Sequence, residues 1–139
     1  MKVLLDTCVV SELVSKQPDP RVVAFIDGLD SDEVYLSVIT IGEIIKGIEK
    51  LPNSRRKTAL RHWLQDDLLA RFQGKILPLD TDVIVAWGVL TARAEAAGTP
   101  MPVIDSLIAA TVLAGKMTLV TRNVADFAAA GIDIINPWQ

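Results

Sequence analysis

Carboxylate side chains stand at or near the ends of the apolar segments that this sequence offers as strands. Asp6 directly follows the apolar run 2–5, and Asp126 comes shortly after the run 118–121. Ligands of layered α/β folds bind beyond the carboxyl ends of the strands, so acids delivered there by separate segments can share one site. The candidate acids are Asp6, Glu43, Asp105 and Asp126, and Asn123 adds an amide oxygen.

An all-oxygen group of this kind favours a hard divalent cation, Mg²⁺ or Mn²⁺, over zinc. The one histidine, His62, lies in a charged segment that we expect to be helical. Carboxylates that cluster without a cation repel one another and raise each other's pKa. A cation that they hold can lower the pKa of a bound water and polarise a phosphodiester. The pattern therefore predicts hydrolysis of phosphodiester bonds with water as the nucleophile.

Each of these residues also has a purely structural interpretation, because Asp, Asn and Thr are preferred at the starts of helices. Thr40 and Glu43 have the spacing of a capping box. Glu43 also lies within the apolar stretch 38–45, so we expect partial burial and a need for a partner or a metal. The remaining candidate caps are Asp6, Asp105 and Asn123, with Asp126 as a first-turn acid. Capping would have to hold at every position separately, and it does not explain a shared sheet edge.

The elements that would carry these residues alternate between strand and helix patterns. We expect strands at 2–5, 34–37, 75–79, 118–121 and 132–135, and helices at 7–14, 21–29, 37–50, 54–74, 81–98, 105–114 and 123–130. Pro78 places the third strand at an edge or a strand end. Apolar rather than alternating strands separated by helices predict an α/β fold in layers, with a mainly parallel sheet of about five strands.

Composition sets the limits within which such a site has to work. The chain has 139 residues, which suits a single domain over residues 1–139, and half of them are hydrophobic. One cysteine, Cys8, rules out an internal disulfide and favours the reducing cytoplasm. No apolar run approaches the length that a membrane span needs. The formal net charge of −3 argues against binding nucleic acid by bulk electrostatics.

Positive charge is nevertheless concentrated in one region of the chain. Within 17 residues the sequence places Lys46, Lys50, Arg55, Arg56, Lys57, Arg61 and His62. Such a run is commonly a solvated surface of a helix–loop–helix, and the charge pattern alone does not separate this from a phosphate-binding surface.

Four segments of this chain resemble the signatures of the PIN-domain family in order and spacing. They are Leu5–Glu12, Ile41–Ile44, Ile104–Ala110 and Val120–Phe127. The resemblance covers essentially the whole chain and is greatest to the VapC-type toxins, including the FitB-like subgroup. It implies a PIN-like three-layer α/β/α fold and an Mg²⁺- or Mn²⁺-dependent endoribonuclease that acts as the toxin of a type II toxin–antitoxin pair.

The resemblance also implies roles for individual residues. Asp6, Glu43 and Asp105 would bind the metal, and Thr7 and Thr121 would support the site through their hydroxyls. For the fourth position we expect Asp126 to supply the charge and Asn123 to assist it. The catalytic group would then be Asp6, Glu43, Asp105, Asp126 and Asn123.

Partners follow from the same resemblance: a cognate antitoxin, an RNA substrate and a second copy of the chain, with no membrane. The antitoxin would lie on an apolar groove that includes Val9, Val10, Leu13 and Val14, unless these are ordinary core. We expect the dimer contact on the helices of residues 38–72. Candidate contacts to RNA phosphates are Lys46, Lys50, Arg55, Arg56 and Arg122. The alternative function is a PIN scaffold that has kept its binding role while Asn123 weakens its metal site.

Overall fold

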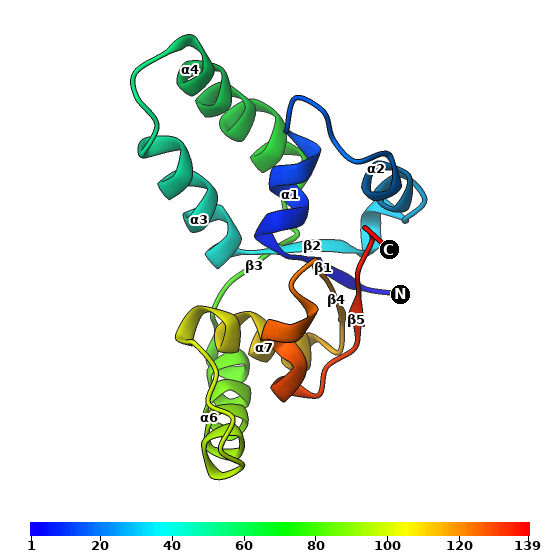
Figure 1. The fold of residues 1–139 in the computed structure, drawn as a ribbon, viewed down its shortest axis with the longest axis vertical. Helices are drawn as coiled ribbons and strands as arrows, with labels where there is room; N and C mark the ends of the chain where they lie inside the picture. Colours follow the sequence, from blue (N-terminus) through cyan, green and yellow to red (C-terminus); the bar gives the residue numbers. More distant parts are fainter.

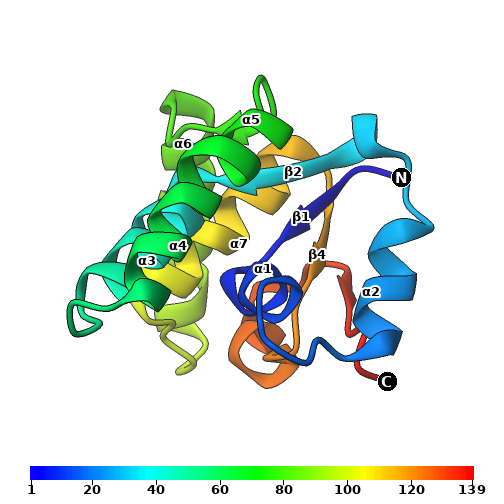
Figure 2. The same ribbon diagram turned by 90° about the horizontal axis from the view of Figure 1, so that it is seen from above.

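A parallel five-stranded sheet forms the centre of the computed structural model, which describes residues 1–139. The strands are β1 (Val3–Leu5), β2 (Val34–Ser37), β3 (Ile76–Leu77), β4 (Thr118–Val120) and β5 (Ile134–Ile135). Their order in the sheet is β3-β2-β1-β4-β5, and helices cover both faces (Figures 1 and 2). This is the three-layer α/β/α arrangement that the sequence predicts. No helix has the length and apolar character needed to cross a membrane.

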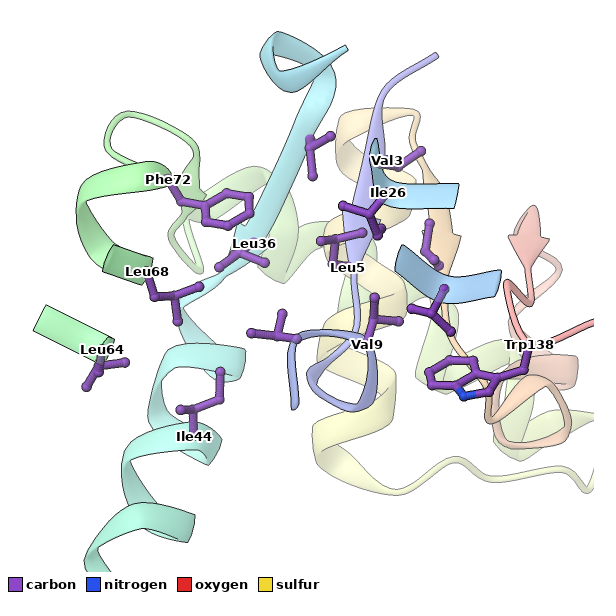
Figure 3. Packing of buried hydrophobic residues seen from close by; sticks show 14 of the residues in the cluster. Val3, Leu5, Val9, Ile26, Leu36, Ile44, Leu64, Leu68, Phe72 and Trp138 are labelled. Atoms are coloured by element: carbon purple, nitrogen blue, oxygen red, sulfur yellow. The ribbon is translucent and has the colours of Figure 1, made fainter. Parts of the chain in front are cut away.

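One face of the sheet packs against the helices of the first half of the chain. These helices are α1 (Thr7–Leu13), α2 (Pro20–Asp27), α3 (Val38–Glu49), α4 (Arg55–His62), the π-helical turn η2 (Trp63–Leu68) and α5 (Leu69–Arg71). Val3 and Leu5 of β1 point into this layer, where they join Val9, Ile44 and Leu68 (Figure 3). All of these side chains are buried, so packing fixes β1 as far as Leu5, the residue before Asp6.

The opposite face is covered by elements from the second half of the chain. They are α6 (Thr81–Ala96), α7 (Val103–Gly115) and the 3-10 helix η3 (Val124–Ala130). Leu4 of β1 points to this side, as period-two alternation requires, and joins Leu90, Ile108 and Phe127 in a second core. Because the two cores share β1, the helices that bear Glu43 and Asp105 are fixed on opposite faces of one strand.

Local sequence signals explain where several elements begin and end. Asp19 caps α2 by accepting a hydrogen bond from the backbone N–H of Arg21, with Pro20 as the first helical residue. Asp80 caps α6 in the same way, and Gly98 follows that helix with φ +76°, a conformation that favours glycine. β3 ends one residue before Pro78 and lies at the sheet edge, as the proline predicts.

Other expectations differ from the structure in instructive ways. The helix predicted over residues 54–74 is a continuous helical run over 55–71 with the π-helical turn η2 inside it. The short 3-10 helix η1 (Ser31–Glu33) precedes β2 and carries no periodic apolar signal. Val9 and Val10 are fully buried, so the core alternative holds for these two residues and they offer no groove to an antitoxin, whereas Leu13 and Val14 are half-buried (Figure 3 shows Val9).

A buried lysine joins α3 to α4. Lys57 is 8% exposed, and its Nζ donates to the carbonyl oxygens of Glu49 and Leu51 at 3.1 and 3.0 Å. These carbonyls lie at the C-terminal end of α3, where the helix has no internal donors left. Arg61 adds an exposed ion pair with Glu49. The α3–α4 pair therefore projects from the sheet as one connected unit (Figure 1).

Candidate functional site: acids at the carboxyl edge of the sheet

Asp6 is both a helix cap and the buried member of the acid group. One carboxylate oxygen accepts from the backbone N–H of Thr7 at 2.8 Å, and the other accepts from the hydroxyl of Thr121 at 2.8 Å. Asp6 is 6% exposed. Burial raises its pKa and the Glu43 carboxylate raises it further, although the hydrogen bonds from Thr121 and Thr7 oppose this change. The cap interpretation is thus correct for Asp6, but it accounts for only one of its two oxygens.

Glu43 reaches the site from α3 and is held by a side chain of α1. The Thr7 hydroxyl donates to Glu43 Oε1 at 2.5 Å and lies 3.2 Å from the hydroxyl of Thr40. Ser37, not Thr40, caps α3, since its hydroxyl accepts from the N–H of Ile39. The capping-box interpretation of Glu43 is therefore wrong. The expected partial burial of Glu43 is also wrong, because its side chain is exposed to solvent although it is hydrogen-bonded to Thr7.

Asp105 lies in the first turn of α7 and does not cap it. The N-cap is Pro102, which makes no side-chain cap bond, and α7 begins two residues earlier than the sequence predicts. Asp105 is half-buried. Burial raises the pKa of Asp105, and the carboxylates of Asp126, Asp6 and Glu43 each raise it further. Three of the predicted acids therefore act on the fourth, Asp105, at this edge, although they come from separate segments.

Asn123 and Asp126 reach the edge from the segment after β4. Asn123 occupies the N-cap position of η3 without a side-chain cap bond, so its amide is free to face solvent. Its backbone N–H donates to the Thr121 hydroxyl at 3.0 Å, which in turn donates to Asp6. Asp126 is exposed in the first turn of η3. Thr121 therefore links this segment to β1 by two hydrogen bonds.

The acids suit a hard cation that keeps part of its own water shell. No three His, Cys, Asp or Glu side chains are close enough to one another to hold an ion by themselves. Mg²⁺ is commonly bound through only one or two carboxylates, with waters completing its coordination. The thiol of Cys8, whose Sγ lies 3.9 Å from Asp6, has a pKa raised by burial and stays protonated. The donor set thus fits Mg²⁺ or Mn²⁺ and offers no thiolate for zinc.

The predicted RNA-binding cations do not gather on one surface. Lys46 and Lys50 lie on the same face of α3 as Glu43, whereas Arg55 and Arg56 begin α4 beyond the far end of α3. Arg122 follows β4, with its guanidinium 5.1 Å from the centre of the Trp138 ring. Of the remaining cations in the basic run, Lys57 and Arg61 are engaged within the α3–α4 unit.

A groove that the sequence did not reveal opens beside the acids. Its volume is about 480 Å³, and it is lined by Ile39, Gly42, Glu43, Lys46, Gly47, Lys50 and Ile104. We call it the α3 groove. Six of its residues recur along one face of α3, and the seventh is the neighbour of Asp105 in α7. Helical spacing could have shown that these α3 residues share a face, but only the fold places Ile104 across from them.

Thr7 offers a test of how the acids are positioned. Thr7→Val removes the hydroxyl that holds Glu43 while preserving side-chain shape and the backbone N–H that binds Asp6. Partners of metal ligands are typically worth about 10–100-fold in metal affinity, so we expect a loss of that order in the affinity for Mn²⁺. Thr7→Ser, which keeps the hydroxyl, should retain the affinity. A Thr7→Val protein with unchanged affinity would show that Glu43 needs no positioning by α1.

Comparison with known proteins identifies the family. The PIN-domain model matches residues 3–132, so the chain belongs to the PIN-domain family. Among its relatives, the VapC ribonuclease Y4jK of Sinorhizobium fredii is 38% identical over 137 residues, which covers 99% of this chain and 98% of that protein. The toxin FitB of Neisseria gonorrhoeae is likewise 38% identical, with 99% of both chains covered.

Solved structures agree with this assignment. The crystal structure of FitAcB from Neisseria gonorrhoeae matches with a TM-score of 0.94 and 38% identity, covering 99% of both chains. A structure of FitAB bound to a DNA fragment matches with a TM-score of 0.93 over 99% of this chain and 96% of the other. The DNA-bound VapBC of Salmonella typhimurium is 26% identical with a TM-score of 0.80, covering 99% and 98% of the two chains. The predicted family and its α/β/α fold are therefore confirmed.

Proposed function

We propose that this protein is an Mg²⁺- or Mn²⁺-dependent endoribonuclease that acts as the toxin of a toxin–antitoxin pair. One observation carries the enzymatic part. At the carboxyl edge of a parallel sheet, acids from three separate segments lie near enough to Asp105 to raise its pKa. A module that only binds a partner has no physical need for such mutually repelling charges. The names of its relatives, VapC ribonuclease and toxin FitB, support the choice of RNA and the toxin role.

In this proposal the residues of the site have different roles. Asp6 and Asp105 would hold the cation from the end of β1 and the first turn of α7, and Glu43 and Asp126 would complete the acid group from α3 and η3. Thr121 and Thr7 fix the Asp6 and Glu43 carboxylates, and Asn123 adds a neutral oxygen. When bound, the cation supplies the positive charge that offsets the acids and the Lewis acidity that phosphodiester hydrolysis requires.

Cleavage of RNA by the purified protein tests this proposal directly. A mixed RNA pool should be cut in Mg²⁺ or Mn²⁺ and remain intact in EDTA, and restoring the metal should restore cutting. Cutting that survives EDTA would contradict the metal requirement. If the antitoxin-free protein cuts no RNA under any condition, a binding scaffold weakened at Asn123 becomes the better account. In that case Asn123→Asp should restore activity.

An antitoxin partner belongs to the same proposal. Related structures are complexes named FitAB and VapBC, which supports a protein partner for this chain. With Val9 and Val10 in the core, the exposed apolar surface for such a partner lies elsewhere. One candidate is a cleft of about 270 Å³ beside α3, α4 and η2, where Ile45 is exposed and the core residues Ile48 and Leu64 contribute to the lining. A cytoplasmic location fits the free cysteine, Cys8.

A homodimer is also proposed, with its contact on α6. In the region 38–72 suggested by the sequence, Leu64 and Leu68 are buried in the core. By contrast, α6 exposes Ile84, Val85 and Val89 by 44, 62 and 47%, and no charged residue lies between positions 83 and 92. A two-fold dimer uses the same patch on both copies, which an uncharged helix face permits.

Val85→Glu should convert that dimer to a monomer. The substitution places two like charges opposite each other near the two-fold axis and removes apolar area from both copies. Light scattering coupled to gel filtration should show the mass fall by half, while the Tm of the monomer changes little. Leu113→Glu, which alters an apolar residue on α7 that is also exposed, by 40%, is the control and should leave the mass unchanged. A dimer that survives Val85→Glu would exclude α6 as its contact.

A further inference from the structure

The turn of α7 that carries Asp105 lacks the usual stabilisation of a helix start. Pro102 occupies the N-cap position and makes no side-chain cap bond. The first N–H groups of a helix have no partner within the helix, so an uncapped first turn opens more easily than a capped one. Asp105 is also repelled by three neighbouring carboxylates, which raise its pKa. A contact from outside α7 is therefore needed to keep Asp105 at the edge of the sheet while no cation offsets this repulsion.

Ser106, the residue after Asp105, makes such a contact. Its side chain is completely buried, and its hydroxyl donates to the carbonyl oxygen of Val103 at 2.7 Å. The same hydroxyl accepts from the indole Nε1 of Trp87 in α6 at 2.9 Å. An indole N–H can only donate, whereas a hydroxyl can accept one bond while it donates another, so both bonds form at the same time. Together they tie the first turn of α7 to the neighbouring helix.

Core packing does not account for Trp87. Its ring is half-buried and belongs to neither of the two core clusters, although Leu90 of the same helix lies in the second of them. α6 and α7 pack side by side (Figure 1), yet the bond from Trp87 to Ser106 is the only side-chain hydrogen bond between them. Of the three tryptophans, only Trp87 donates a hydrogen bond through its indole. The indole N–H therefore connects the two helices at the turn that bears Asp105.

We propose that Trp87 is a positioning residue of the acid group, which holds Asp105 in place for the cation through the hydroxyl of Ser106. This inference rests on the proposed function and names a residue outside the acid group on which metal binding depends. With the link intact, Asp105 is already in place when a cation arrives. Without the link, the turn relaxes away from the other acids, and binding has to bring it back. The affinity for the cation then falls by up to the strength of the lost hydrogen bond, a factor of about two to ten.

Isothermal titration calorimetry with MnCl₂ tests the link from both of its ends. Trp87→Phe removes the indole N–H and Ser106→Ala removes the hydroxyl, and each should weaken Mn²⁺ binding about two- to tenfold. Because both substitutions break the same link, the double variant should bind Mn²⁺ no more weakly than the weaker of the two single variants. Trp63→Phe is the matched control. Trp63 is also half-buried but packs against the first core without an indole hydrogen bond, so its loss should leave the affinity unchanged.

Hydrogen exchange tests the link without any metal. The backbone N–H of Ser106 donates to the carbonyl oxygen of Pro102 at 2.9 Å, so its exchange reports on opening of the first turn of α7. In EDTA, NMR should show that this N–H exchanges about two- to tenfold faster in Trp87→Phe than in the wild type. Trp63→Phe should leave the exchange rate unchanged, because opening of this turn does not disturb Trp63. Equal acceleration in both variants would mean a general loss of stability and no specific hold on the turn.

The positioning role and the nuclease function can fail separately in these experiments. Wild-type affinity for Mn²⁺ in Trp87→Phe and Ser106→Ala would overturn the positioning role, as would additive losses in the double variant. Both results leave cleavage by the wild type untouched. Conversely, a wild type that binds Mn²⁺ but cuts no RNA, with weaker Mn²⁺ binding in both single variants, would uphold the role of Trp87 and refute the nuclease function. A wild type that binds no Mn²⁺ would overturn both.

Discussion

Asp6→Asn should reduce metal-dependent RNA cleavage at least about 100-fold, because even partners of metal ligands are worth 10–100-fold. The substitution removes the negative charge of the Asp6 side chain but keeps the shape of that side chain. Asparagine is an equally good N-cap, so its side-chain oxygen can still accept from the N–H of Thr7. Its amide can donate to the Thr121 hydroxyl, which reverses the bond seen in the structure. Initial rates of cleavage of a labelled RNA, with circular dichroism as a check on folding, measure the effect.

Asp80→Asn is the matched control for this experiment. Asp80 also caps a helix through its side chain, by accepting from the N–H of Val83, but it lies outside the acid group. The two substitutions change the same atoms at the N-cap of a helix, although Asp6 is buried and Asp80 is exposed, so a role in capping alone would leave RNA cleavage intact in both variants. Activity should be lost only in Asp6→Asn. Equal activities in the two variants would mean that Asp6 is merely a cap.

Mn²⁺ should stabilise the wild-type protein and have almost no effect on Asp105→Asn. Binding to the folded state alone contributes about 2.7 kcal/mol when the ion is present at 100 times its Kd. For a domain of this size that corresponds to a rise of roughly 10 °C in Tm. Differential scanning fluorimetry with MnCl₂, with CaCl₂ and NaCl for comparison, measures the shift. A wild-type Tm that does not respond to Mn²⁺, nor to MgCl₂ in the same assay, would remove the metal from the mechanism.

Without metal, the order of stability should reverse, with Asp105→Asn more stable than the wild type at neutral pH. Burial and three neighbouring carboxylates raise the pKa of Asp105, so its charged form is less favourable in the folded protein than in the unfolded chain. That cost appears as the pH rises above the unfolded pKa of about 3.9 and is complete above the raised value. The advantage of the variant should therefore vanish below about pH 4. A wild type that remains the more stable protein in EDTA at pH 7 would contradict this electrostatic account.

Much of the fold was predictable because its signals are local. Asp19 with Pro20, and Asp80 three residues before Val83, mark helix starts through side-chain caps that need no distant partner. The strands are short apolar runs, so their positions could be read directly, and Pro78 indicated an edge. The shared edge of Asp6 and Asp126 follows from parallel strands, which the alternation of strands and helices already predicts.

Other features depend on tertiary contacts and could not be read locally. Thr40 and Glu43 match a capping box, but α3 has its N-cap at Ser37, as the helix predicted over 37–50 requires, and the Thr40 hydroxyl instead lies 3.2 Å from that of Thr7 in α1. The apolar pattern of Val9 and Val10 fits either a surface groove or the core. Only the packing of α1 against the sheet shows that they belong to the core. The α3 groove depends on Ile104, which lies more than 50 residues away in the chain. Sequence spacing carries no information about such a neighbour.

The buried Lys57 has a consequence for how this protein can diverge. It ties α4 to α3 through main-chain oxygens, which every amino acid carries, so the joint does not depend on which side chains the two helices display. Most residues on the outer faces of both helices can therefore be exchanged while the joint is kept. Substitutions on the surface of this projecting unit can therefore change which partner it binds without disturbing the fold. Related copies of such a protein in one genome could in this way bind different partners.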